Sequence, residues 1–461
     1  MNQLASKSLS SPTADVPRLA DRLFREEAGK LVSVLTRIFG IDRLELAEDA
    51  VQEALVRALR TWPYYGIPEN PAAWITQTAK NLALDIVRRE KRFRDKEPHI
   101  IASIDGFVLG EPPALETEIK DDRLRLMFAC CHPLIPPEAQ TALALKTLCG
   151  FNTAEIAIAF LTSEAAIAKR LTRARQKIRE LQIPFEIPAG EELSIRLDGV
   201  LQTLYLLFNE GYKASSGDNL IREELCQEAI RLVTVLAEHP VSKQPRTHAL
   251  LALMLLNAAR LPARVDAKGN ILRLKEQDRS SWNQPMIAQG MRHLTESAAG
   301  DEITGYHLQA GIAACHCAAT DYKSTNWPRI LALYDRLVEI DDSPVVALNR
   351  AVAIAEVHGA RAGIDAVEAI QNNRQLGSYY LLYAVLAEFE SQLNDLLAAA
   401  NHLRKALQLT GLKSEQSFLL SRLRDCESVS AVPFDAAASN RIVTRGRHAM
   451  DGSPNKTINN L

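Results

Sequence analysis

The stretch PPEAQTALALKTLCGFNTAEIAIAFLTSEAAIAKRLTRARQKIRE (136–180) decides how this part of the chain folds. Its apolar residues recur at helical spacing and divide into three helices. We expect the first helix to run from Pro137 to Gly150, Thr153 to cap the second, and Ser163 to cap the third after a tight turn. Two short helices joined by so short a turn, the second of them basic, are typical of a helix-turn-helix that binds DNA.

The third of these helices has two contrasting sides. At about 100° per residue, its apolar residues share one side and are predicted to face the core: Ile167, Leu171, Ala174 and Ile178. On the other side Lys169 and Thr172 are predicted to reach base edges, while the arginines and Lys177 reach phosphates. The residues expected to contact DNA are Ser163, Ala165, Ala168, Lys169, Arg170, Thr172, Arg173, Arg175 and Lys177. The alternative is a basic helix face that is merely solvated.

The whole chain is nearly neutral, so any contact with nucleic acid must come from local patches. It has 461 residues with 54 basic and 56 acidic side chains, and 47% of its residues are apolar. No apolar run is long enough to predict a membrane span, and the N-terminus lacks the apolar segment of a signal peptide. Seven irregularly spaced cysteines suit a reducing cytoplasm.

Helical spacing extends along nearly all of the chain, which predicts an all-α protein. Two small helical domains are expected on either side of a linker rich in Gly, Pro and acidic residues, followed by a larger helical domain and a disordered tail. The predicted boundaries are 19–94, 95–121 (linker), 122–184, 191–426 and 427–461 (tail).

The first helical domain contains two strongly patterned segments. The segment 44–62 is predicted to bury Ala47, Val51, Ala54, Ala58 and Trp62. The segment 69–92 begins with Asn70 as a cap and Pro71 at the first helical position. Its buried stripe is expected at Ile75, Ala79, Leu82 and Ile86.

Three motifs in this order resemble bacterial RNA polymerase sigma factors of the extracytoplasmic-function type, in which a flexible linker joins helical regions 2 and 4. EDAVQEALVRALRTW (48–62) resembles region 2.2, and PAAWITQTAKNLALDIVRREKR (71–92) resembles regions 2.3 and 2.4. AEIAIAFLTSEAAIAKRLTRARQKIRE (154–180) resembles region 4.2, the reader of the minus-35 element. The resemblance covers about 19–183 and implies a protein that is not an enzyme and needs no cofactor.

The resemblance implies two partners, core RNA polymerase (its β and β′ subunits) and promoter DNA. The polar face expected to dock on the β′ clamp contains Asp49, Gln52, Glu53 and Arg57. The residues expected at the minus-10 element are Tyr64 and Tyr65 on a loop, Asn81 and Asp85 near an extruded base, and Arg88, Arg89 and Arg92 on phosphates. Simple loop packing is the alternative for the tyrosines. The acidic linker either threads the polymerase's RNA channel or is a plain spacer.

The C-terminal domain resembles a subgroup of these sigma factors with a long helical extension of tetratricopeptide-like repeats. LQTLYLLFNEGY (201–212) and PARVDAKGNILRLKEQDRSSWN (262–283) carry that resemblance. Similar segments recur at 334–341, 366–373 and 403–410, which indicates helical repeats. We expect this domain to be a contact surface for a regulatory protein.

No metal site is expected, because ACCHP (129–133) and ACHCAA (314–319) lack workable ligand spacing. Two other classes of function stay open. A helix-turn-helix regulator with a ligand- or protein-sensing domain explains 136–180 and 191–426 but not 44–94. A tetratricopeptide scaffold leaves both basic clusters unexplained.

Overall fold

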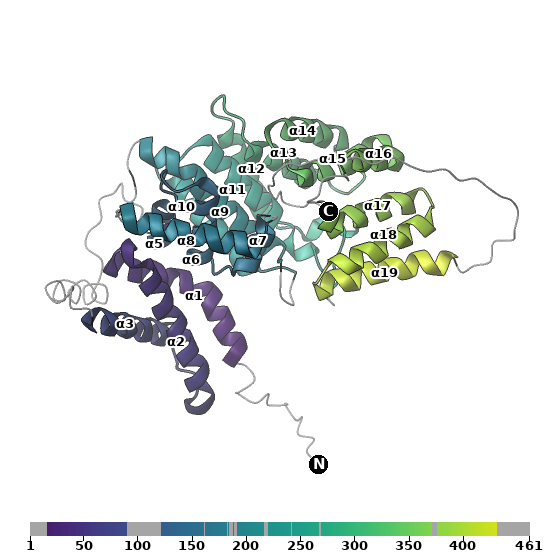
Figure 1. The fold of residues 1–461 in the computed structure, drawn as a ribbon. Coiled ribbons are helices and arrows are strands. Elements are labelled where there is room, and N and C mark those ends of the chain that lie inside the picture. The colour runs from purple at the N-terminus through teal and green to yellow at the C-terminus, as the bar shows by residue number, and fades with distance from the viewer. Residues whose placement is uncertain are drawn as a thin grey trace, which may run out of the picture. The chain divides into compact units, whose positions relative to one another are not determined.

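The computed structural model describes residues 16–89, 121–160, 162–181, 183, 188, 191–215, 220–240, 242–266, 269–370 and 376–430 (Figure 1). These residues are helical throughout, apart from loops and an isolated bridge between Val265 and Ile271. The all-α prediction is therefore confirmed. No helix among them is long and apolar enough to cross a bilayer. Most of the predicted linker and tail lies outside the described residues.

The described chain divides into two compact units. The N-terminal unit comprises the chain up to Ile156 with 164–203 and 239–242, and the C-terminal unit comprises the remainder. The predicted end of the helical domain at 426 falls inside the last helix, which continues to Ser430. The helix is not interrupted at 426 because no Gly or Pro occurs between 426 and 432.

The N-terminal unit begins with three helices that pack on one another, α1 (Val16–Phe39), α2 (Leu44–Tyr65) and α3 (Pro71–Arg89). All five residues predicted to be buried in α2 are buried. The start of α3 is also confirmed, since the Asn70 Oδ1 accepts a hydrogen bond from the Ala73 amide at 3.0 Å.

The predicted buried face of α3 is partly wrong. Ile75 and Ala79 are buried, but the stripe continues through Ala83 and Val87, while Ile86 is 36% exposed. The buried face is thus rotated by about 50° from the one that the largest apolar residues define. Contact with α1 and α2 determines the face, because small alanines allow the helices to approach closely.

The same unit continues through α5 (Asp122–Cys130), α6 (Pro137–Leu148), α7 (Thr153–Ala159), α8 (Glu164–Leu181) and α9 (Glu191–Tyr212), of which α7 and α9 extend into the C-terminal unit. Helix α6 packs on α1, α5 and α8. At the contact with α1, a Cβ added to Gly29 would lie 2.0 Å from the Leu148 carbonyl oxygen. The two backbones therefore touch at a position that only glycine permits.

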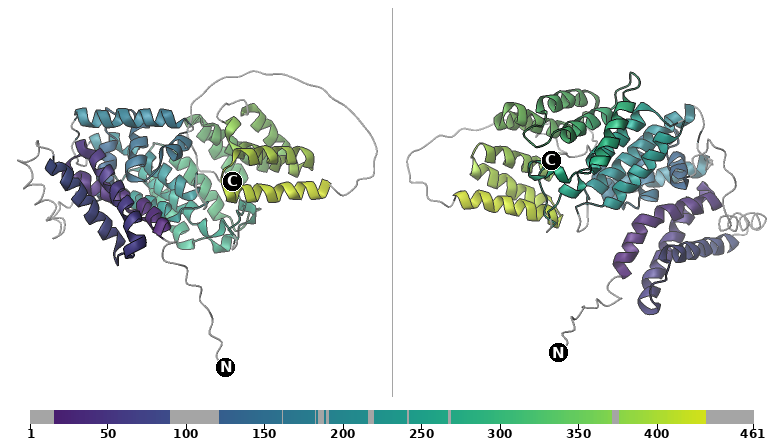
Figure 2. Two further views of the ribbon diagram at one scale, coloured as in Figure 1. Left: turned by 60° about the horizontal axis from the view of Figure 1, so that its bottom comes forward. Right: turned by 180° about the vertical axis from the view of Figure 1, so that it is seen from behind.

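Most helices of the C-terminal unit pack on the next helix in the chain. Its helices are α10 (Glu223–Glu238), α11 (Pro245–Ala258), α12 (Gln284–Ser297), α13 (Gly305–Ala318), α14 (Trp327–Ile340), α15 (Pro344–His358), α16 (Ala360–Ile370), α17 (Tyr380–Gln392), α18 (Leu396–Leu409) and α19 (Lys413–Ser430). Helix α13 differs, because it packs more extensively on α11 than on α12. Figure 2 shows α14–α16 and α17–α19 as two groups of side-by-side helices. A core cluster of buried residues runs through α15–α19, and a second joins α13, α14 and α15.

Candidate nucleic-acid interface

The polar face of α2 is exposed as predicted from its pattern. Asp49, Gln52, Glu53 and Arg57 are all exposed, and the Glu53 carboxylate accepts a hydrogen bond from the Arg57 Nε at 3.0 Å. The buried apolar residues of α2 point into the unit, whereas Val56 and Leu59 are exposed alongside this polar face.

Tyr64 and Tyr65 are 84% and 87% exposed, but they lie in the last turn of α2 and not on a loop. The helix ends one residue later, at Gly66, whose φ of 86° favours glycine. The loop prediction is wrong because Pro63 does not end the helix. Two aromatic rings are thus presented to solvent on a rigid element.

Helix α3 presents a polar stripe with one residue at each turn. Asn81, Asp85 and Arg88 are exposed, and Asn81 accepts a hydrogen bond from the Gln77 amide at 3.0 Å. Arg89 is exposed beside them, whereas Arg92 lies outside the described residues. Asn81 keeps its own amide N–H groups for a partner such as a base edge.

The helix-turn-helix segment is built from α6, α7 and α8. Its second helix is capped by Asn152 and not by Thr153, which is the first helical residue. The Asn152 Oδ1 accepts from the Glu155 amide at 2.8 Å, and the Glu155 Oε2 accepts from the Asn152 amide at 2.9 Å. This reciprocal pair satisfies two N–H groups, which a Thr153 cap would leave open. Ser163 directly precedes α8.

Helix α8 has the buried apolar side and the exposed polar side that the spacing of its residues predicts. All four residues of its apolar side are buried. The exposed side contains Ala165, Ala168, Lys169, Thr172, Arg173 and Lys177. The Thr172 hydroxyl donates to the Ala168 carbonyl at 3.0 Å, so its oxygen can still accept a hydrogen bond. The exposed side therefore combines small residues with cations.

Three arginines of α8 form ion pairs inside the N-terminal unit. Arg175 Nη2 lies 2.7 Å from the Glu48 Oε2, and the same carboxylate accepts a hydrogen bond from Thr147 at 2.7 Å. Arg179 pairs with Glu45 at 3.2 Å, and Arg170 pairs with Glu138 at 3.0 Å. The pairs with Glu45 and Glu48 were not expected from the sequence, because these two glutamates are more than 100 residues away from α8. Arg170 and Arg175 are predicted phosphate contacts, and in this structure both are engaged internally.

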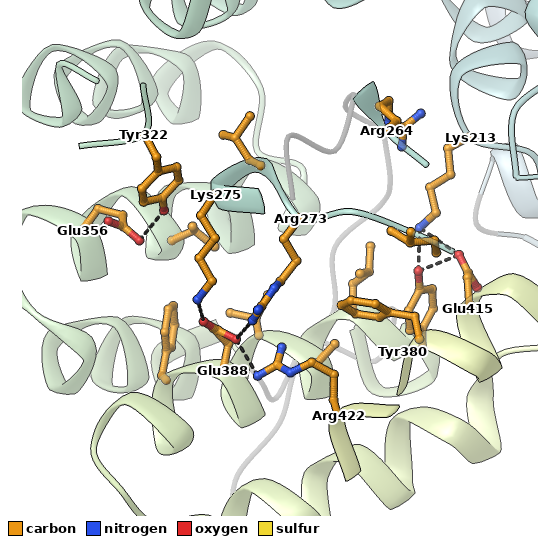
Figure 3. A pocket seen from close by; sticks show the side chains of 18 of the residues that line it. Lys213, Arg264, Arg273, Lys275, Tyr322, Glu356, Tyr380, Glu388, Glu415 and Arg422 are labelled. Carbon is orange, nitrogen blue, oxygen red and sulfur yellow. Dashed lines mark hydrogen bonds and ion pairs between the residues drawn. The ribbon is translucent and has the colours of Figure 1, made fainter. Parts of the chain in front are cut away.

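The C-terminal unit contains a cavity of about 160 Å³ (Figure 3). It is lined by the 264–275 segment and by residues of α14, α15, α17 and α19. Glu388 lies at one side, where Arg273, Lys275 and Arg422 converge on it. Lys213, Tyr380 and Glu415 form a second polar group at the other side.

Two imidazoles and a carboxylate meet between α11 and α12. The Nδ1 atoms of His248 and His293 are 3.0 Å apart, and the Glu296 Oε2 lies 3.2 and 3.5 Å from them. Ligands around a tetrahedral zinc ion at 2.0–2.1 Å would be separated by about 3.3 Å. The three donors thus fit a zinc ion. Sequence spacing could not reveal them, because His248 is 45 residues from His293.

Two segments of the chain match families with a known role. Residues 23–93 match sigma-70 region 2, and residues 125–178 match sigma-70 region 4. Residues 196–298 match a family of unknown function, DUF6596. The N-terminal part of the chain therefore carries both sigma-70 regions, and it is similar to extracytoplasmic-function sigma factors. Both predicted sigma regions are therefore confirmed.

The chain also has a relative along most of its length. It is 36% identical to an uncharacterized protein, R00370, of Rhizobium meliloti, over 82% of this chain and 90% of that protein. The ECF RNA polymerase sigma factor SigL of Mycobacterium tuberculosis is 29% identical over 37% of this chain and 93% of its own length. SigE of Mycolicibacterium smegmatis is 28% identical over 35% of this chain and 60% of its own length. No solved structure matches the chain.

Proposed function

We propose that this protein binds core RNA polymerase in the cytoplasm, directs it to promoters, and helps to open the DNA. The observation that carries this proposal is the order of two sigma regions, 23–93 and 125–178, with an exposed basic face on the second. The mycobacterial relatives, which are RNA polymerase sigma factors, support the same reading.

The exposed face of α2 is the proposed docking surface for the polymerase β′ subunit. Its four polar residues share one side of the helix and are not used in packing. A charged, rigid helix face suits a specific contact with another helical element.

The end of α2 and the stripe on α3 are the proposed minus-10 site. Extruding a base costs a few kcal/mol, which stacking on an aromatic ring and hydrogen bonds to its edge offset. Tyr64 and Tyr65 offer exposed rings, and Asn81 offers an amide that both donates and accepts. Asp85 is one turn further on, and Arg88 and Arg89 suit phosphates.

Helix α8 is the proposed reader of the minus-35 element. Ala165 and Ala168 leave room for the helix in the major groove, and Lys169 and Thr172 would reach base edges. Arg173 and Lys177 are exposed and suit phosphates, whereas Arg170 and Arg175 reach DNA only after their ion pairs open.

The C-terminal unit is the proposed regulatory module, a tetratricopeptide-like stack that contacts a protein. The recurring segments at 334, 366 and 403 fall in α14, α16 and α18, the second helices of successive hairpins, which supports a repeat. Leu397 at the start of α18 is 73% exposed, and the proposed protein contact is tested at this residue.

Reconstitution with core polymerase tests the proposal. Specific run-off transcripts are expected from the full chain and purified core enzyme, and loss of binding is expected from Gln52→Ala with Glu53→Lys. A helix-turn-helix regulator with a sensing domain, the alternative, would give transcripts only with another sigma factor present.

For the C-terminal module, Leu397→Asp should change the transcript yield. An identical yield at every polymerase concentration contradicts a regulatory role for this surface.

A further inference from the structure

The cavity in the C-terminal unit has the size and wall of a small-molecule site. Its volume is about 160 Å³, close to that of a cavity of about 150 Å³ that accepts benzene in another protein. Apolar side chains from four segments form most of its wall: Ile271, Trp327, Leu381, Val385, Phe389 and Phe418. A body about the size of one ring would fill it.

One side of the cavity is a compensated ion cluster. The Glu388 carboxylate lies 2.6 Å from the Lys275 Nζ, 3.0 Å from Arg273 and 2.5 Å from Arg422 (Figure 3). Arg273 also pairs with Glu276. This cluster ties the 273–276 segment to α17 and α19, and so it fixes the cavity's shape.

The other side contains a cation without a carboxylate. Arg264 is buried, its guanidinium lies 3.8 Å from the Tyr212 ring centre, and it donates to the Tyr212 carbonyl oxygen. No carboxylate pairs with Arg264 among the described residues. The nearby Glu415 is already engaged by Lys213 at 3.3 Å and by the Tyr380 hydroxyl at 2.5 Å. Burial lowers the pKa of Arg264, which reflects the cost of holding this charge unpaired.

The charges around the cavity are unequal. Five cations line it, against three carboxylates. The cations are Lys213, Arg264, Arg273, Lys275 and Arg422, and the carboxylates are Glu356, Glu388 and Glu415. An anionic ligand would therefore be favoured and a cationic one opposed.

We propose that this cavity binds a small organic acid, with an apolar body of about one ring against the wall and its carboxylate at Arg264 and Lys213. The carboxylate would supply the buried guanidinium with the bidentate partner that it lacks. The volume favours a small molecule over an acidic peptide, of which it could accept only one side chain. Both sides of the cavity lie in the C-terminal unit, so binding does not depend on the proposed sigma activity.

Benzoate, benzyl alcohol and benzylamine test the charge requirement on the full-length chain. They share one ring and differ in charge, and saturation-transfer NMR at low salt detects millimolar binding of each. Benzoate should bind at least about tenfold more tightly than benzylamine, since its carboxylate gains charged hydrogen bonds where an ammonium would be repelled. Equal binding of the three, or no binding of benzoate, would overturn the proposal.

Three variants test the location. Ala384→Leu fills the cavity and Arg264→Gln removes the unpaired charge, so both should weaken benzoate binding about tenfold or more. Arg361→Gln is the matched control, because it removes an exposed arginine of the same unit that does not line the cavity, and its affinity should stay within about twofold. Thermal unfolding checks that each variant is folded. Unchanged binding by both Ala384→Leu and Arg264→Gln, or binding of an acidic peptide without benzoate, contradicts the assignment.

Discussion

The guanidinium of Arg175 in α8 lies 2.7 Å from the carboxylate of Glu48 in α2, so a residue of sigma region 4 is neutralised by one of region 2. Both side chains are largely buried, with 21% and 12% exposure. The pair therefore holds a proposed DNA-binding cation away from phosphate, and it does so within a nearly dry contact.

Glu48→Gln should increase the affinity of the free chain for minus-35 duplex DNA several-fold and make the salt dependence steeper by about one phosphate contact. The reason is that Arg175 loses its competing carboxylate. The free energy of unfolding should fall by about 1–2 kcal/mol. Fluorescence anisotropy at several salt concentrations measures the binding. Glu69→Gln removes the same charge from an exposed residue, and an equal effect there would refute the competition.

Lys169 and Lys177 lie on the same exposed side of α8 but should act differently. Lys169→Ala should relax the choice of bases in the minus-35 element by about 1–3 kcal/mol at one position. Lys177→Ala should instead weaken binding to all sequences alike and lower the salt slope by about one. Binding to a set of single-base variants of the element distinguishes the two, and the same profile for both would exclude a specific role for Lys169.

Gly29→Ala should destabilise the N-terminal unit by at least about 1–3 kcal/mol, since the new Cβ would overlap the Leu148 carbonyl oxygen. Gly411→Ala is the matched control, because no atom lies within 4 Å of the added Cβ. Thermal unfolding of both variants measures the difference. A Gly29 variant as stable as the control would show that the helices separate easily here.

Acid should weaken the C-terminal unit through Glu388. Burial alone would raise the pKa of this carboxyl, but Arg422, Lys275 and Arg273 outweigh burial and lower it to about 2, from a usual value of 4.5. Because the folded-state pKa is depressed, its contribution is complete above about pH 4.5 and is lost as the pH falls toward 2. The contribution is at most about 3 kcal/mol.

Urea unfolding of Glu388→Gln at several pH values measures this effect. The variant should be less stable than the parent at pH 7, and the difference should shrink between pH 4.5 and 2 as Glu388 becomes protonated. Exposed Glu368→Gln serves as the control. A difference that stays constant across this range would mean that the Glu388 charge does not stabilise the fold.

Zinc should bind at His248, His293 and Glu296 and raise the melting temperature. At a free zinc concentration of one hundred times the dissociation constant, the free energy of unfolding should rise by about 2.7 kcal/mol. A chelator should reverse the shift. His293→Ala should abolish the shift, while His402→Ala, which alters a histidine that pairs with Glu390 away from this site, should not. If the parent chain and both variants showed the same rise in melting temperature, zinc would bind at another place.

The sequence was sufficient to predict a structural feature wherever the spacing or capping pattern lies within a single helix. The apolar side of α8 and the start of α3 at Asn70 and Pro71 follow from spacing and capping within one segment. The face of α3 was mispredicted because its neighbours select Ala83 and Val87 over the larger Ile86. Helix ends were also uncertain: Gly66 and not Pro63 ends α2, and Asn152 and not Thr153 caps α7.

Features assembled from distant segments could not be predicted. The partner of Arg175 is 127 residues away, and the cavity joins residues from Lys213 to Arg422. Each contributing segment taken alone is an ordinary amphipathic helix or loop. Only the packing of the helices brings their polar groups together.

The touching backbones of Gly29 and Leu148 limit what the N-terminal unit can do as it stands. Elements named minus-10 and minus-35 are about 25 base pairs apart, or roughly 85 Å at 3.4 Å per base pair. Under the proposed function, regions 2 and 4 have to bind at sites separated by this distance. The 31 residues between Arg89 and Asp121 could extend to about 100 Å, which is enough to bridge that distance. Simultaneous binding of both proposed elements would then require α1 and α6 to separate, and the strength of their contact would become part of the threshold for transcription.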